Sequence, residues 1–130
     1  MKTRVYYADT DAGGVVYYAN YLRWLEMARW ELLEDLGMSV AEYAANGFIF
    51  AVVHVEMDYL TPAVLGDELE IETEVERVRR VRFTVRHSVK RIADGQELAA
   101  ASVTLACLSR EGKIISLPEA LASVLRSRVA

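Results

Sequence analysis

The stretch YYADTDAGGVVYYANYLRWLE, residues 6–26, joins a polar turn directly to an apolar segment. Two carboxylates, Asp9 and Asp11, and the pair Gly13 and Gly14 interrupt a run of tyrosines and valines. Adjacent glycines indicate a tight turn in which positive φ is needed. The residues after the turn are apolar at every third or fourth position, the spacing of one face of a helix.

This helix is expected to begin between Tyr18 and Tyr21, with Asn20 as its cap, and to run to about Leu36, where Gly37 ends it. Its buried face is predicted to hold Tyr18, Tyr21, Leu22, Leu25, Ala28, Leu32 and Leu36, widened by Trp24, Met27, Trp30 and Leu33. That leaves Arg23, Glu26, Arg29, Glu31, Glu34 and Asp35 for water or partners. A helix this apolar is expected to be wrapped by other elements.

The remaining elements are mostly strands. A short strand is expected at residues 3–7, a short helix at 39–45 capped by Ser39, and a C-terminal helix at 117–128. Strands are predicted at residues 48–59, 68–76, 80–90 and 97–109. Short connections indicate an antiparallel meander, so the fold class is α+β, with a curved sheet enclosing one long helix. The partly polar outer face of the last strand suggests that another subunit covers it.

Composition limits the function classes. At 130 residues, 53% hydrophobic and 26% charged, the chain fits one globular domain, residues 1–130, and no apolar run reaches the ~18 residues of a membrane-spanning helix. The net charge of −4 argues against a nucleic-acid partner. The N-terminus lacks an apolar signal core, and Cys107 is the only cysteine. A cytoplasmic location is therefore expected.

The acidic turn has several possible roles. A calcium loop starting at Asp9 would need oxygen ligands at its fifth and twelfth positions, where Gly13 and Asn20 stand. Phosphoryl transfer would need a larger parallel sheet. A carboxylate beside the N–H groups of a helix N-terminus could instead attack a carbonyl whose oxyanion those groups stabilise. The same spacing also fits a simple Asx turn, in which the carboxylate only caps the backbone, and that role is the more common one.

The segment YYADTDAGGVVYYANYLRWLEMAR resembles the signature of the hotdog-fold acyl-CoA thioesterases, the 4-hydroxybenzoyl-CoA thioesterase and YbgC-like family. The signature's two acids, its glycine and its Asn-Tyr pair all match without gaps. The likeness continues through FAVVHVEMDYLTPAVLGDELEIET and ADGQELAAASVTLACLSREGKIISLPE, nearly to the C-terminus. It implies a helix wrapped by an antiparallel sheet, with dimers that join edge to edge and often form tetramers.

The resemblance also implies the site. Its catalytic carboxylate corresponds to Asp11, and Tyr7 matches a tyrosine near the active site of the YbgC-like branch. Tyr18 stands where that branch often has histidine and the hydroxybenzoyl-specific branch has tyrosine, whose backbone N–H polarises the thioester carbonyl. Gly14 and Tyr17 complete the expected substrate-binding residues. Aliphatic and aromatic acyl groups both remain open.

The other reactive side chains are expected to be structural. His54 is predicted to pair with acids on its own strand face, and His87 and Cys107 to lie in the core. No zinc-ligand spacing and no serine-hydrolase elbow occurs. Seven of the 15 basic residues lie at positions 77–91, where they could bind CoA phosphates. The preferred alternative is a hairpin that sets Arg80, Arg82 and Arg86 opposite Glu76, Glu74 and Glu70.

The sequence therefore predicts a thioesterase that hydrolyses an acyl-CoA, with CoA arriving as part of the substrate, no metal and no other cofactor. A homodimer or homotetramer is expected. Two alternatives stay open. One is a hotdog hydratase, which would require a catalytic histidine, and the other is a non-catalytic subunit that binds acyl thioesters or serves as a scaffold.

Overall fold

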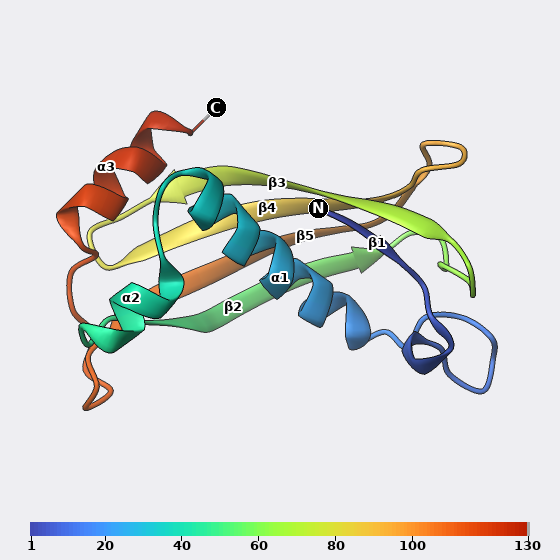
Figure 1. The fold of residues 1–130 in the computed structure, drawn as a ribbon, viewed down its shortest axis with the longest axis horizontal. Coiled ribbons are helices and arrows are strands. Elements are labelled where there is room, and N and C mark those ends of the chain that lie inside the picture. The colour runs from blue at the N-terminus through green and yellow to red at the C-terminus, as the bar shows by residue number, and fades with distance from the viewer. Residues whose placement is uncertain (130) are drawn as a thin grey trace.

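The computed structural model describes residues 1–129; Ala130, the last residue of the expected domain, lies outside them. The chain forms β1 (Lys2–Arg4), a 3-10 turn η1 (Tyr7–Asp9), α1 (Asn20–Asp35), α2 (Val40–Ala45), β2 (Ile49–Tyr59), β3 (Glu68–Val78), β4 (Arg82–Arg91), β5 (Glu97–Leu108) and α3 (Glu119–Ser127). Figure 1 shows α1 crossing one face of the sheet, with the loop that precedes it at one end and α2 at the other. This is the α+β hotdog arrangement that the resemblance implies. No helix within residues 1–129 is both long and apolar enough to cross a membrane.

The strands form one antiparallel sheet in the order β1-β3-β4-β5-β2. The predicted meander is right for β3, β4 and β5 but wrong for β2, which pairs with β5 and not with β3. The reason is the connection of residues 60–67, which is too long for a hairpin and carries the chain from one edge of the sheet toward the other. β2 is therefore an edge strand.

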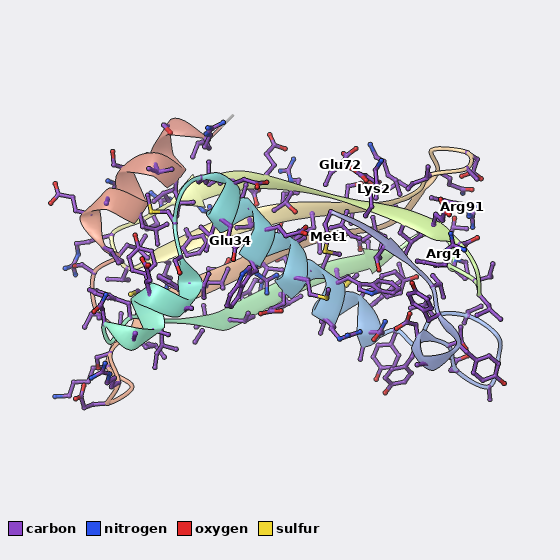
Figure 2. The ribbon with its side chains drawn as sticks, viewed as in Figure 1. Met1, Lys2, Arg4, Glu34, Glu72 and Arg91 are labelled. Atoms are coloured by element: carbon purple, nitrogen blue, oxygen red, sulfur yellow. The ribbon has the colours of Figure 1, made fainter. Side chains whose placement is uncertain are left out.

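The end of the sheet beside this connection is fastened by ion pairs. Arg91 on β4 contacts Asp67 at 3.2 Å and Asp94 at 2.9 Å, and Arg4 on β1 pairs with Glu68 on β3. Figure 2 shows Arg4 and Arg91 at this same end of the molecule. Arg91 holds the connection to β4, and the backbone bridge between Val15 and Val64 joins the connection to the loop that carries Asp11.

The predicted helix begins and ends close to the expected residues, but its buried face is rotated. Leu22 is 41% exposed, although it was assigned to the core. Arg29 was assigned to water, yet it is 8% exposed. The buried face consists of Tyr21, Trp24, Leu25, Ala28, Arg29 and Leu33. A helix that crosses a sheet at an angle buries side chains along a line diagonal to its axis. The apolar period of the sequence does not determine the direction of that line.

The hairpin of β3 and β4 has the predicted faces but the wrong register. Glu74 faces Arg86 and Glu70 faces Lys90, four residues beyond the expected partners Arg82 and Arg86. The turn begins later than expected, with Arg79 donating its N–H to the Arg82 carbonyl at 2.7 Å. A shift of four residues keeps every side chain on its own face, because strand side chains alternate with a period of two.

Candidate active site

The loop before α1 is a small antiparallel hairpin with Asp11 at its base. Thr10 and Val16 form a bridge, and the Asp11 N–H donates to the Val15 carbonyl at 2.9 Å. The Asp11 carboxylate is exposed and accepts the Gly13 N–H at 2.8 Å. Gly14 has φ +77°, a conformation that strains other residues. Asp11 thus does make the Asx-turn bond, and the bond fixes its side chain while its carboxylate still faces open space.

Asp9, in contrast, is a buried anchor. Its carboxylate, 8% exposed, accepts the Tyr6 N–H at 2.8 Å through Oδ2 and the Asn20 side-chain amide at 3.0 Å through Oδ1. Two predictions are corrected by these bonds. Asn20 does not cap α1, whose N-cap is Ala19, but holds Asp9. The strand expected at residues 3–7 ends at Arg4, because the Asp9 carboxylate turns the chain into η1.

The start of α1 presents unpaired N–H groups. The Tyr17 N–H is engaged by the Asp9 carbonyl at 2.9 Å. Within residues 1–129, the N–H groups of Tyr18 and Ala19 have no hydrogen-bond acceptor. Since N–H groups at a helix start carry partial positive charge, this pair is suited to bind a developing oxyanion. Of the two N–H groups expected to hold an oxyanion, that of Tyr17 is occupied, and that of Tyr18 has no acceptor within residues 1–129.

Tyrosines build a hollow beside the helix start. The Tyr18 and Tyr59 rings meet edge to face at 6.4 Å, and the Tyr59 hydroxyl donates to the Tyr18 carbonyl at 3.0 Å. The Tyr17 ring lies tilted by 48° against the Tyr18 ring, with their centroids 4.9 Å apart. The hollow of about 180 Å³ is lined by Val15, Val16, Tyr18, Tyr21, Tyr59, Leu60, Thr61 and Pro62. Tyr59 was not predicted as a site residue, since a tyrosine at the end of a strand carries no local signal of its function.

The predicted site residues lie in one segment, but they do not enclose a site by themselves. Asp11, Tyr17 and Tyr18 are exposed, and Tyr7, in η1, is 82% exposed. Tyr7 is tied to the loop only through its carbonyl, which accepts the Thr10 hydroxyl at 2.8 Å. These residues form one open wall, which leaves room for a ligand or a second subunit.

The histidines and the cysteine lie where they were predicted. His54 is exposed and 3.1 Å from Glu56. His87 is 1% exposed in the core, and burial together with the Arg29 charge lowers its pKa to about 3. Burial raises the pKa of the Cys107 thiol, which is fully covered. No cluster of three metal-ligating side chains occurs within residues 1–129.

Among the basic residues at positions 77–91, two groups differ in their partners. Arg86 pairs with Glu76 at 3.0 Å and Lys90 with Glu72 at 3.2 Å, so charge pairing across the hairpin is confirmed with shifted partners. A second group, which makes no ion pair within residues 1–129, surrounds a hollow of about 430 Å³ on the sheet face away from α1: Arg77, Arg79 and Arg82, together with Val53, His54, Phe83, Thr84 and Thr104.

Comparison with known proteins identifies the family. Residues 5–125 match the model of the thioesterase-like superfamily. The chain belongs to this superfamily. The thioesterase-like chain is 38% identical over 105 residues to the acyl-CoA thioester hydrolase YbgC of Escherichia coli O6:H1, covering 81% of this chain and 78% of the relative. It is 30% identical over 125 residues to the 1,4-dihydroxy-2-naphthoyl-CoA hydrolase of Thermosynechococcus vestitus, covering 95% and 85% of the two chains.

Solved structures agree with the fold of this superfamily member. The crystal structure of a 1,4-dihydroxy-2-naphthoyl-CoA thioesterase from Synechocystis superposes with a TM-score of 0.89 at 26% identity, covering 97% of this chain and 93% of the other. The name of YbgC specifies no particular acyl group, whereas the names of the other two proteins specify an aromatic one, 1,4-dihydroxy-2-naphthoyl.

Proposed function

We propose that this protein is an acyl-CoA thioesterase, which hydrolyses the thioester of an acyl-CoA to a free acid and CoA. One observation carries the proposal: the exposed Asp11 carboxylate and the acceptor-free N–H of Tyr18 belong to a single loop and helix start in a thioesterase-like chain. The names of the relatives support the same reaction.

The chemistry requires only water and the groups of the chain. The Tyr18 N–H donates to the thioester oxygen as it becomes an oxyanion. Asp11 either removes a proton from water as the water oxygen bonds to the acyl carbon, or attacks that carbon to give an anhydride that water then opens. In both cases the carbon–sulfur bond breaks, and the thiolate leaves and takes up a proton. CoA enters and leaves as part of substrate and product, so no resident cofactor is required.

The open wall is completed by a second copy of the chain. β2 is an edge strand of 11 residues with half-exposed apolar side chains, among them Val52 at 48% and Val53 at 47% exposure. A long apolar edge is a template for pairing with another strand. Two β2 strands related by a two-fold axis pair antiparallel, which yields a homodimer with a continuous sheet. Further association into a homotetramer is distinguished from the dimer by measuring the mass in solution, and a monomer would contradict this assembly.

The alternatives have less support. A hotdog hydratase would want a reactive histidine, but the core holds His87 neutral and His54 lies on the sheet with Glu56. A scaffolding subunit would have no use for an exposed carboxylate at Asp11. We place the enzyme in the cytoplasm, because its one thiol, Cys107, is buried and free.

The test is thiol release from a panel of aliphatic and aromatic acyl-CoAs, read with a disulfide dye. Asp11→Asn should keep the fold and lose at least ~10²-fold in rate. Asp35→Asn is the control, because Asp35 is an exposed aspartate at the opposite end of α1. Equal activity of the two variants would refute the assignment of Asp11, and no release from any acyl-CoA would refute the reaction.

A further inference from the structure

Arg29 is a buried cation without an anionic partner. It lies on the face of α1 that packs on the sheet, and it is 8% exposed. Its one side-chain hydrogen bond within residues 1–129 runs from Nη1 to His87 Nε2, at 3.3 Å. No carboxylate lies within ion-pair distance of it in this part of the chain. A guanidinium stays protonated even when buried, so its charge remains uncompensated inside the protein.

The neighbouring histidine cannot supply that compensation. Thr73 Oγ1 lies 3.2 Å from His87 Nδ1, on the side of the ring away from Arg29. A neutral imidazole offers one acceptor nitrogen to one N–H of Arg29. The guanidinium has five N–H donors in a planar fork, which matches the two oxygens of a carboxylate.

The remaining donors of Arg29 reach open space. Within residues 1–129, Glu70 Oε2 is the only fully covered side-chain polar atom that lacks a hydrogen-bond partner. The Arg29 nitrogens without partners are therefore accessible, and Arg29 lines a cavity of about 120 Å³ between α1, α2 and the sheet. Its lining is otherwise mostly apolar and includes Phe50 and Val52 of β2, with Glu26 as its other charged residue.

We propose that this cavity binds the far end of an acyl group that carries a carboxylate, so that the preferred substrate is the CoA half-thioester of a dicarboxylic acid. Arg29 binds the carboxylate, and the apolar walls hold the carbon chain. A cavity of roughly 150 Å³ accommodates a benzene molecule, so the space here suits a spacer of roughly four carbons. This inference rests on the proposed thioesterase activity and specifies its substrate class.

The position of the cavity relative to the thioester follows from the dimer. Within one chain, Arg29 lies nine residues beyond Asn20, about 13 Å along α1, which is too far for a short acyl group bound at Tyr18. Phe50 and Val52, however, place the cavity at the start of the β2 edge. In an antiparallel pair of β2 strands, the start of one lies beside the end of the other. The partner subunit's Tyr59 and the helix start that it contacts then approach the cavity of this chain.

The charges around the cavity permit an anion to enter. Glu26 lies close enough to Arg29 to oppose the pKa decrease that burial causes. Its side chain is exposed to water, which screens its repulsion of an incoming carboxylate. When the substrate carboxylate binds, Arg29 changes from an unpaired buried charge to a buried, hydrogen-bonded ion pair. The unpaired charge has the higher free energy of the two.

The experiment compares adipoyl-CoA with hexanoyl-CoA, which differ only in the terminal carboxylate. The quantity measured is the ratio of their kcat/KM values, for the full chain and for Arg29→Met, Arg29→Lys and Arg126→Met. We expect the wild type to prefer adipoyl-CoA, and Arg29→Met to lower the ratio roughly 10- to 100-fold, the usual effect of losing a charged hydrogen bond. Arg29→Lys should retain part of the preference. Arg126, an exposed arginine on α3, is the matched control and should leave the ratio at its wild-type value.

Binding of free adipate and free hexanoate, measured by calorimetry, separates this inference from the proposed reaction. Adipate binding that is lost in Arg29→Met supports the cavity assignment even if no acyl-CoA is hydrolysed. Hydrolysis of hexanoyl-CoA at least as fast as adipoyl-CoA, without adipate binding, overturns the assignment while leaving the thioesterase activity intact. If Arg29→Met fails to fold, the wild-type comparisons remain decisive: preference for adipoyl-CoA over hexanoyl-CoA together with binding of adipate but not hexanoate supports the assignment, and the absence of both overturns it.

Discussion

His87 couples the stability of the fold to pH. The imidazole is buried between Arg29 on α1 and Thr73 on β3, and its pKa falls from 6.5 to about 3 through burial and the nearby guanidinium. In the unfolded chain the ring takes up its proton near pH 6.5. The folded-state value is the lower one, so the unfolded state binds the proton first. The stability that depends on the neutral ring is fully present above pH 6.5 and is lost as the pH falls toward 3.

The size of this effect follows from the same values. The interval between 6.5 and about 3 corresponds to about 5 kcal/mol of unfolding free energy over the whole range. About 3 kcal/mol of it is lost between pH 6.5 and pH 4. This is a large fraction of the 5–15 kcal/mol typical of a small domain. His87→Gln removes the titrating ring and keeps an amide for Arg29 and Thr73.

The assay is urea unfolding at a series of pH values from 4 to 8. The unfolding free energy of the wild type should fall more steeply below pH 6.5 than that of His87→Gln, by about 3 kcal/mol at pH 4 relative to pH 6.5. His54→Gln is the control, because His54 is exposed and stays hydrated in both states. It should follow the wild type. Parallel curves for the wild type and His87→Gln would show that the core does not exclude the charged ring.

Two further substitutions test the parts of the fold that position the site. Asn20→Ala removes the amide that donates to the Asp9 carboxylate at 3.0 Å, and it should lower the free energy of unfolding by about 1 kcal/mol, measured as a lower Tm. An unchanged Tm would mean that Asp9 does not need this hydrogen bond. Leu25→Ala, at a fully covered position, should lower the free energy of unfolding in urea by about 2–5 kcal/mol, whereas Leu22→Ala, at a half-exposed position, should lower it by less than about 1 kcal/mol. Equal losses would contradict the observed buried face of α1.

The sequence predicted the elements because their signals are local. The Gly13 and Gly14 turn, the period of α1 and the Ser39 cap of α2, which accepts the Glu42 N–H at 3.1 Å, all depend on neighbours within a few residues. The period of two likewise placed each hairpin side chain on its correct face. The register was not predicted correctly because it depends on the position of the turn. Alternating charged side chains are compatible with any shift of the register by an even number of residues.

The site was predicted only as far as its motif extends. The motif predicted roles for Asp11 and Tyr18 but none for Asp9, which the structure shows to be buried while Asp11 is exposed. Tyr59 and Arg29 were missed for another reason. Each acquires its environment from a distant segment: Tyr59 from the Tyr18 carbonyl, and Arg29 from the sheet that covers it. Contacts of this range leave no periodic trace in the sequence.

A crystal structure of the Asp11→Asn variant with a bound acyl-CoA would show where the thioester lies relative to residue 11 and the start of α1. We expect the thioester oxygen at about 2.7–3.1 Å from the Tyr18 nitrogen, with the residue 11 side chain beside the acyl carbon. A thioester held at any other part of the molecule, away from this helix start, would contradict this expectation.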